Sequence, residues 1–273
     1  MVYIHHPYPS FSTEHSQRIY TAPINNNPAP AASVVPDNPT LVSFVTERVD
    51  TAASPHAPAF LRNLPKANED PQGYRAVTLN YAATVQFKIT CVPDINWLMA
   101  ILQSPAHPQL YMAVTKLEFS GFHWFSGIAH NRHVNPNLEL VASLPSVAEV
   151  AIYLHTAGLT VSVWNERERL RLENQGFLER SKQLRVLSLR DVVQKYDLEK
   201  MLACGALRVV TLVIYDCSTV RYHCGQADPL AGFCQLQNWL MMGFLQDQGR
   251  RVDVQLVRER LDANGTKVRE NLN

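Results

Sequence analysis

Residues 135–155 (NPNLELVASLPSVAEVAIYLH) predict one short helix followed directly by one strand. Asn135 suits the N-cap, because its side-chain oxygen accepts a hydrogen bond from a free amide of the first turn. Pro136 suits the first helical position, and Pro145 ends the helix. The strand at 147–154 is rich in β-branched residues, which is typical of a strand covered on both faces. A helix of about two turns is unstable alone in water, so a larger core must hold the unit.

The strand of this unit is entered through an apolar-x-x-apolar-x-apolar pattern, which leucine-rich repeats also use. Five occurrences predict repeated helix–strand units with right-handed connections. The expected fold is therefore an α/β fold with a mainly parallel, leucine-rich-repeat-like sheet, flat or curved. The intervals are irregular, whereas a true solenoid keeps a tight period. The occurrences begin at Tyr74, Val114, Val147, Leu184 and Leu207.

One of these occurrences has a competing interpretation. Leu184 to Leu187 is compatible with a short strand. Ser188 and Asp191 instead resemble an N-cap followed by an acid in the first turn of a helix. We favour the cap and helix, which removes one apparent repeat.

Other segments have clearer periodicity. Residues 75–91 alternate and predict one long strand or two short ones. Residues 207–215 (LRVVTLVIY) form the strongest strand pattern, and residues 252–256 predict a final strand. Asp228 and Gly249 bracket the best helix pattern as N-cap and C-terminal glycine.

The two ends of the chain differ in composition from its middle. Residues 1–72 hold eleven of the seventeen prolines and no glycine, so we expect a disordered Pro/Ala/Asn-rich tail. Within it, the apolar segment 41–49 is either a transient patch, which we favour, or a short helix that docks on the body or on a partner. The α/β domain is expected at 73–260, with a polar C-terminal tail at 261–273.

Composition excludes several classes of protein. The net charge is +1 at pH 7, unlike the basic footprint of a nucleic-acid binder. Five scattered cysteines do not make a disulfide framework, and the start of the chain does not resemble a secretory signal. No run of about 18 apolar residues is present to span a membrane. We therefore expect an intracellular protein, cytoplasmic or nuclear, that binds neither membrane nor nucleic acid.

The loop 121–134 (GFHWFSGIAHNRHV) concentrates aromatic and histidine side chains after the strand that begins near Val114. Imidazoles suit zinc and related ions, but their spacing here matches no standard site, so surface or packed histidines are favoured. We expect Phe122, Trp124 and Phe125 to pack over the end of the sheet. The loop also supplies the candidate binding residues, which are His123, Trp124, Phe125, His130 and His133.

Motifs for common chemistry are missing from the sequence. It contains no Gly-rich phosphate loop, G-x-S-x-G, H-E-x-x-H or dinucleotide fingerprint. Cys217, Cys224 and Cys234 are too far apart for paired zinc ligands. We therefore assign no catalytic residue, metal or cofactor.

Three stretches, NPNLELVASLPSVAEVAIYLHTAGL, VVQKYDLEKMLACGALRVVTL and LQNWLMMGFLQDQGRRVDVQL, resemble an uncharacterised family of filamentous ascomycete proteins. The resemblance covers residues 75–258 and implies no activity. Some relatives are similar to the repeat regions of fungal F-box proteins, but KANEDPQGY after Leu64-Pro65 does not form F-box helices. The first hypothesis is a non-catalytic protein-interaction module of unknown partner. The alternative is a small-molecule enzyme or metal-binding protein that uses the histidine loop, because α/β sheets place ligands at strand ends.

Overall fold

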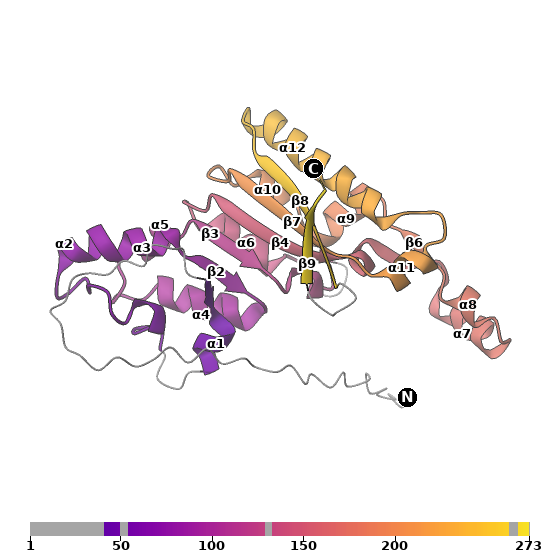
Figure 1. Cartoon of the computed structure of the whole chain (residues 1–273), viewed down its shortest axis with the longest axis horizontal. Coiled ribbons are helices and arrows are strands. Elements are labelled where there is room, and N and C mark those ends of the chain that lie inside the picture. Colours follow the sequence, from indigo (N-terminus) through magenta and orange to yellow (C-terminus); the bar gives the residue numbers. More distant parts are fainter. Residues whose placement is uncertain (1–40, 50–53, 129–132, 262–266, 273) are drawn as a thin grey trace. The chain divides into compact units, whose positions relative to one another are not determined.

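A seven-stranded sheet runs through the computed structural model (Figure 1). The structure describes residues 41–49, 54–128, 133–261 and 267–272, which all belong to the unit Val35–Asn273. The strand order is β1-β2-β3-β4-β7-β8-β9, and all neighbours are parallel except the antiparallel pair β8 and β9. The strands are β1 (Leu41–Ser43), β2 (Gln86–Ile89), β3 (Lys116–Phe119), β4 (Glu149–His155), β7 (Val209–Tyr215), β8 (Asp253–Leu261) and β9 (Lys267–Asn271).

The connections between these strands carry the helices and a small second sheet. The second sheet pairs β5 (Thr160–Ser162) with β6 (Leu184–Val186). Short 3-10 segments are η1 (Ala59–Leu61), η3 (Phe122–Trp124) and η4 (Thr156–Leu159), and η2 (Tyr74–Thr78) is a π-helical turn. The α-helices are α1 (Phe44–Val49), α2 (Pro71–Gly73), α3 (Leu79–Thr84), α4 (Val92–Leu102), α5 (Leu110–Ala113), α6 (Pro136–Ser143), α7 (Glu166–Asn174), α8 (Leu178–Ser181), α9 (Leu189–Tyr196), α10 (Glu199–Leu202), α11 (Ser218–His223) and α12 (Pro229–Gln248).

The chain adds its parallel strands in one direction across the sheet. Right-handed crossovers then place the connecting helices on the same face of the sheet. Accordingly, α4 contacts α6, α6 contacts α10, and α10 contacts α12, so these helices follow one another along the sheet (Figure 1). The predicted α/β fold with a mainly parallel sheet is confirmed.

Three of the five apolar patterns lead into neighbouring strands of this sheet, in the same register. The carbonyl of Thr115 accepts hydrogen bonds from the amides of Ala148 and Glu149, and the carbonyl of Ala148 accepts from those of Arg208 and Val209. The pattern therefore marks equivalent points at which the chain enters adjacent strands. The aligned side chains are buried: Leu117, Val150 and Val210 in one row, and Phe119, Ile152 and Leu212 in the next.

The pattern that begins at Tyr74 is not a strand, and the prediction for residues 75–91 is wrong over most of its length. Asp70 accepts a hydrogen bond from the amide of Gly73 and starts a helical segment. Tyr74, Thr78 and Tyr81 are buried at helical spacing, so the buried side chains follow a helical period although the sequence also alternates. Only Gln86–Ile89 forms a strand.

The segment after Gln183 contains both of the competing elements. Leu184–Val186 is a strand, but it pairs antiparallel with β5 outside the main sheet. Ser188 then caps α9 and exchanges hydrogen bonds with Asp191 in a capping box, as favoured from the sequence. The strand and the cap coexist because the cap needs only the residue directly before the helix.

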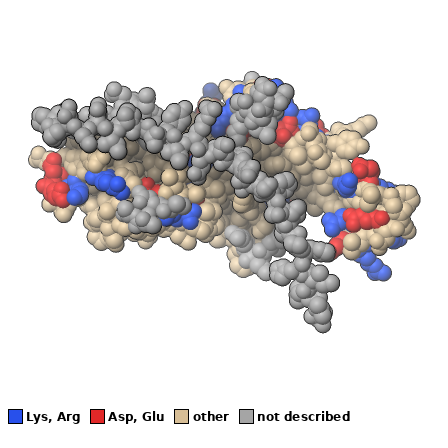
Figure 2. Space-filling view, turned by 60° about the horizontal axis from the view of Figure 1, so that its bottom comes forward, with Lys and Arg blue, Asp and Glu red and all other residues tan. Residues whose placement is uncertain are grey.

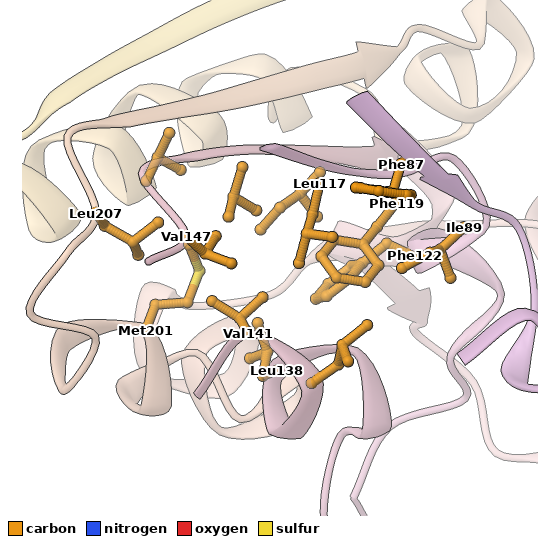
Figure 3. Packing of buried hydrophobic residues seen from close by; sticks show 14 of the residues in the cluster. Phe87, Ile89, Leu117, Phe119, Phe122, Leu138, Val141, Val147, Met201 and Leu207 are labelled. Atoms are coloured by element: carbon orange, nitrogen blue, oxygen red, sulfur yellow. The ribbon is translucent and has the colours of Figure 1, made fainter. Parts of the chain in front are cut away.

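The unit at 135–155 is confirmed as helix α6, capped by Asn135, followed by strand β4. In Figure 3, Leu138 and Val141 of α6 lie beneath Leu117 and Phe119 of the sheet. Burial alternates at the start of β4, where Val150 and Ile152 are buried and the residues between them are only partly so. In the second half of the strand, Ile152, Tyr153 and Leu154 are buried in succession, so the expectation of a strand covered on both faces holds there but not in the first half.

Residues 41–49 dock on the body, in contrast to the favoured transient patch. Strand β1 pairs in parallel with β2, and the fully buried ring of Phe44 stacks on Phe87 with centroids 5.8 Å apart. Arg48 forms an ion pair with the buried carboxylate of Asp94. The folded unit thus begins upstream of the expected boundary at residue 73. A few apolar side chains are enough to dock this segment, because the edge of β2 pairs with its backbone and Asp94 binds its arginine. Residues 1–40 of the expected tail lie outside the described residues.

Residues 267–271 of the expected polar tail form strand β9 on the edge of β8. Backbone pairing does not require apolar side chains, and Arg269 and Glu270 find partners of opposite charge on β8. Charged residues also make up α7, where Arg169 and Glu173 form an i,i+4 ion pair. Figure 2 shows acidic and basic side chains interspersed at the end of the molecule that carries α7, on the right of the view.

Candidate binding site at the carboxyl edge of the sheet

The turn after β3 begins at a glycine that the packing requires. A Cβ added to Gly121 would lie 1.7 Å from the carbonyl oxygen of Thr90, which follows β2. The amide of Ser120 donates to the carbonyl of Ile89, so the two strand ends are held together at this point. The close approach directs η3 across the carboxyl edge of the sheet, where the parallel strands end.

The turn separates its aromatic side chains into buried and exposed ones. Phe122 is fully buried and stacks on Tyr196 of α9, with ring centroids 5.6 Å apart. Phe125 is 6% exposed and also contacts Tyr196. Trp124 is 76% exposed, so the expectation that it packs over the end of the sheet is wrong. Phe122 and Phe125 fill that place, and Trp124 is left for solvent or a partner.

His123 lies in a group of rings on the carboxyl edge. Its ring centroid is 5.4 Å from that of Tyr215, which ends β7, and 6.3 Å from that of His155, which ends β4. Burial, together with the charge that His155 would carry, lowers the pKa of His123 to about 4. Burial also lowers the pKa of His155. Both rings are therefore neutral at pH 7.

The neutral ring of His155 has an assignable proton. Its Nδ1 accepts a hydrogen bond of 2.9 Å from the amide of Ala157. In a neutral imidazole the other nitrogen then carries the proton, so Nε2 is a donor. This geometry suits hydrogen bonding to an acceptor more than metal ligation through Nδ1.

The predicted site residues do not converge on one centre. His133 is exposed and lines a separate cavity of about 620 Å³ with residues of α9 and α12, including Trp239. His130 lies outside the described residues. Over the described ranges, no group of three or more His, Cys, Asp or Glu side chains is arranged to hold a metal ion.

Strand β9 adds a cation to the same edge of the sheet. Nη2 of Arg269 donates to the hydroxyl of Tyr153 at 2.6 Å, and its Nε lies 3.1 Å from Glu259. Burial and the nearby Glu118 carboxylate raise the pKa of Tyr153 well above its usual value, so the phenol stays protonated. A segment expected to be a free tail thus helps to build the candidate site.

A cavity of about 710 Å³ opens beside these rings, past the ends of β4 and β7. Its walls combine aromatic, cationic and acidic side chains from three separate stretches of sequence. The stretches are the end of β4, the segment from β7 into α11, and the far half of β8. The lining residues are His155, Tyr215, Asp216, Cys217, Ser218, Arg221, Arg258, Glu259 and Arg260.

Asp216 organises the arginines of this cavity. Its side chain is 6% exposed, and its Oδ2 accepts from Nε of Arg258 at 3.0 Å and from Nη1 of Arg221 at 3.2 Å. Nη2 of Arg258 donates to the same oxygen. One buried carboxylate therefore orients two guanidinium groups toward a common space.

Sequence reasoning found the loop but missed the cavity. His155, Tyr215 and Asp216 each end a predicted strand or follow it directly, and parallel strands end at one edge of a sheet. That rule could have grouped them. Arg258 and Arg260 gave no such signal, because the predicted final strand ended at residue 256, whereas β8 runs on to Leu261.

The chain was compared with known proteins at the levels of family, sequence and structure. No family model, curated protein or solved structure matches it. Along the described part of the chain, none of the helices combines the length and apolar character needed to cross a membrane.

Proposed function

We propose that this chain is a non-catalytic protein-interaction module, and that its contact surface is the carboxyl edge of the sheet. One observation carries the proposal: Trp124 and Tyr222 are 76% and 72% exposed at that edge. Together with Arg221, which shares α11 with Tyr222, they represent the residue types that dominate binding energy at protein interfaces. Exposed rings of this size leave a large apolar area in water, and a partner would cover it.

The placement of the two rings supports a single surface. Trp124 follows β3 and Tyr222 follows β7, and only β4 lies between those strands. Neighbouring strands are about 4.8 Å apart, so the two strand ends are separated by about 10 Å. An ordinary protein interface of about 800 Å² per partner is roughly 30 Å across, so a single interface can cover both strand ends.

The architecture supports a finer assignment within the same proposal. Strands added in one direction, with helices on one face, are the arrangement of leucine-rich-repeat-like proteins, and the chain would be an irregular member of that class. The resemblance to an uncharacterised ascomycete family, some of whose relatives are similar to the repeat regions of F-box proteins, is in keeping with this role. The alternative enzyme or metal-binding role finds less support, because His133 lines a cavity other than the one beside His155.

Crosslinked affinity purification from the native cell tests the proposal. The full chain is used, because residues 73–273 lack β1 and α1. We expect a specific protein to be captured by the wild type and by Phe177→Ala, and to be lost with the double variant Trp124→Ala/Tyr222→Ala. Phe177 is a matched control, since it is also an exposed aromatic residue, 55% exposed, but adjoins α7 and α8. Equal capture by all three proteins would refute the proposed surface.

A further inference from the structure

The arginines of the 710 Å³ cavity retain hydrogen-bonding capacity. Arg221 contacts Asp216 through Nη1 only, and Arg260 contacts Glu270 through Nη2 only. In the regions that the structure describes, Nε and Nη2 of Arg221 have no acceptor, and neither do Nε and Nη1 of Arg260. The two side chains are 39% and 50% exposed, so these donors are accessible.

The charge of the cavity favours an anion. Its lining holds three guanidinium groups and two carboxylates, and the partners just outside it cancel, because Arg269 pairs with Glu259 and Glu270 pairs with Arg260. Arginine does not lose its proton in proteins, so this excess of positive charge persists across the working range of pH. The neutral His155 contributes a further N–H donor to the same lining.

The guanidinium groups are held in place before any ligand arrives. Asp216 is almost fully buried and binds Arg221 and Arg258, while Glu270 binds Arg260. Ordering of long side chains is one of the main costs of association, and this arrangement reduces it. The planar fork of a guanidinium suits the paired oxygens of a carboxylate or a phosphate.

We propose that this cavity receives an anionic side chain of the protein partner, carboxylate or phosphate, bound by Arg221 and Arg260. Asp216 and Glu270 act as positioning residues. The inference rests on the proposed function, because Trp124 and Tyr222 stand at the same carboxyl edge and would contact the segment that carries the anion. Acidic peptide segments are therefore the expected ligands.

The test uses blocked peptides and the folded full-length chain. Nε–Hε signals of Arg221 and Arg260 are followed by NMR during titration with hexaglutamate, a hexaserine containing one phosphoserine, hexalysine and inorganic phosphate. We expect at least one of the two acidic peptides to shift these signals, and binding to weaken at least tenfold in Arg221→Gln/Arg260→Gln. The control Arg190→Gln, an exposed arginine on α9 that lines the other cavity, should bind like the wild type. The stronger of the two acidic peptides identifies the group.

Four results would overturn the inference: no shift with either acidic peptide, equal shifts with hexalysine, binding that persists in the double variant, or inorganic phosphate that binds as tightly as the peptides. The last result would indicate a site for small anions. Failure here is distinguishable from failure of the proposed function. If capture of a partner depends on Trp124 and Tyr222 but not on Arg221 and Arg260, the interaction surface stands and the anion site does not.

Discussion

Phe122 and Trp124 are neighbours in one turn, yet the structure gives their side chains opposite roles. Phe122 is completely buried and stacks on Tyr196, whereas Trp124 is 76% exposed. Replacing a buried phenylalanine by alanine costs about 3 to 5 kcal/mol, through lost apolar contacts and the cavity left behind. Loss of the ring pair with Tyr196 belongs to this cost. We therefore expect Phe122→Ala to destabilise the chain by about 3 to 5 kcal/mol.

Trp124→Ala should change the free energy of unfolding by less than about 1 kcal/mol, because exposed side chains contribute little to the folded state. Both variants are compared with the wild type by equilibrium urea denaturation at one temperature. Far-UV circular dichroism is the suitable probe, since removal of Trp124 alters fluorescence directly. The midpoint and the slope together separate a change in stability from a change in the unfolded state. A cost above about 2 kcal/mol for Trp124→Ala, or below about 1 for Phe122→Ala, would refute the assignment of the two rings.

Three further predictions concern other parts of the fold. Phe44→Ala should destabilise the unit by about 3 to 5 kcal/mol in the same urea assay, because Phe44 is buried against Phe87; a loss below about 1 kcal/mol would mean that segment 41–49 does not dock. Gly121→Ala should lower the free energy of unfolding by about 3 kcal/mol, because the new Cβ meets a backbone carbonyl. Gly205→Ala, whose Cβ would have no atom within 4 Å, should change it by no more than about 0.5 kcal/mol. Equal melting temperatures for the two variants would contradict this. His123 has its pKa lowered to about 4 by burial, so the unfolded chain takes up the proton first as pH falls from 6.5 toward 4. Stability should therefore drop across that window by up to about 3 kcal/mol, less where solvent reaches the ring. His123→Gln should reduce the drop and leave the part that His155 contributes, while the exposed His133→Gln keeps all of it.

Local signals located several elements correctly. The caps of α6, α9 and α12 are Asn135, Ser188 and Asp228, and each accepts a hydrogen bond from a first-turn amide as expected. Capping depends on residues within one turn, so it can be recognised without knowledge of the rest of the fold. Strands β4 and β7 were recognisable for a similar reason, because runs of β-branched apolar residues indicate buried parallel strands.

Other segments carried two patterns at once. The stretch around Tyr74 and Tyr81 alternates like a strand, but its buried side chains also recur at helical spacing. Composition likewise misplaced residues 41–49 and 267–271, whose order depends on the edges of β2 and β8. A sheet edge supplies backbone partners to a weakly apolar segment, and no local pattern records that the edge is present.

By itself the sequence determined the α/β class, the repeated entry into parallel strands and the loop at their carboxyl edge, because periodicity and capping act over a few residues. Only the tertiary structure decided that Trp124 is exposed beside a buried Phe122, since exposure depends on what Tyr196 of α9 already covers. It alone also brought Asp216, Arg221 and Arg258 together. These groups lie up to 42 residues apart, and their convergence follows from the order of β7 and β8 in the sheet.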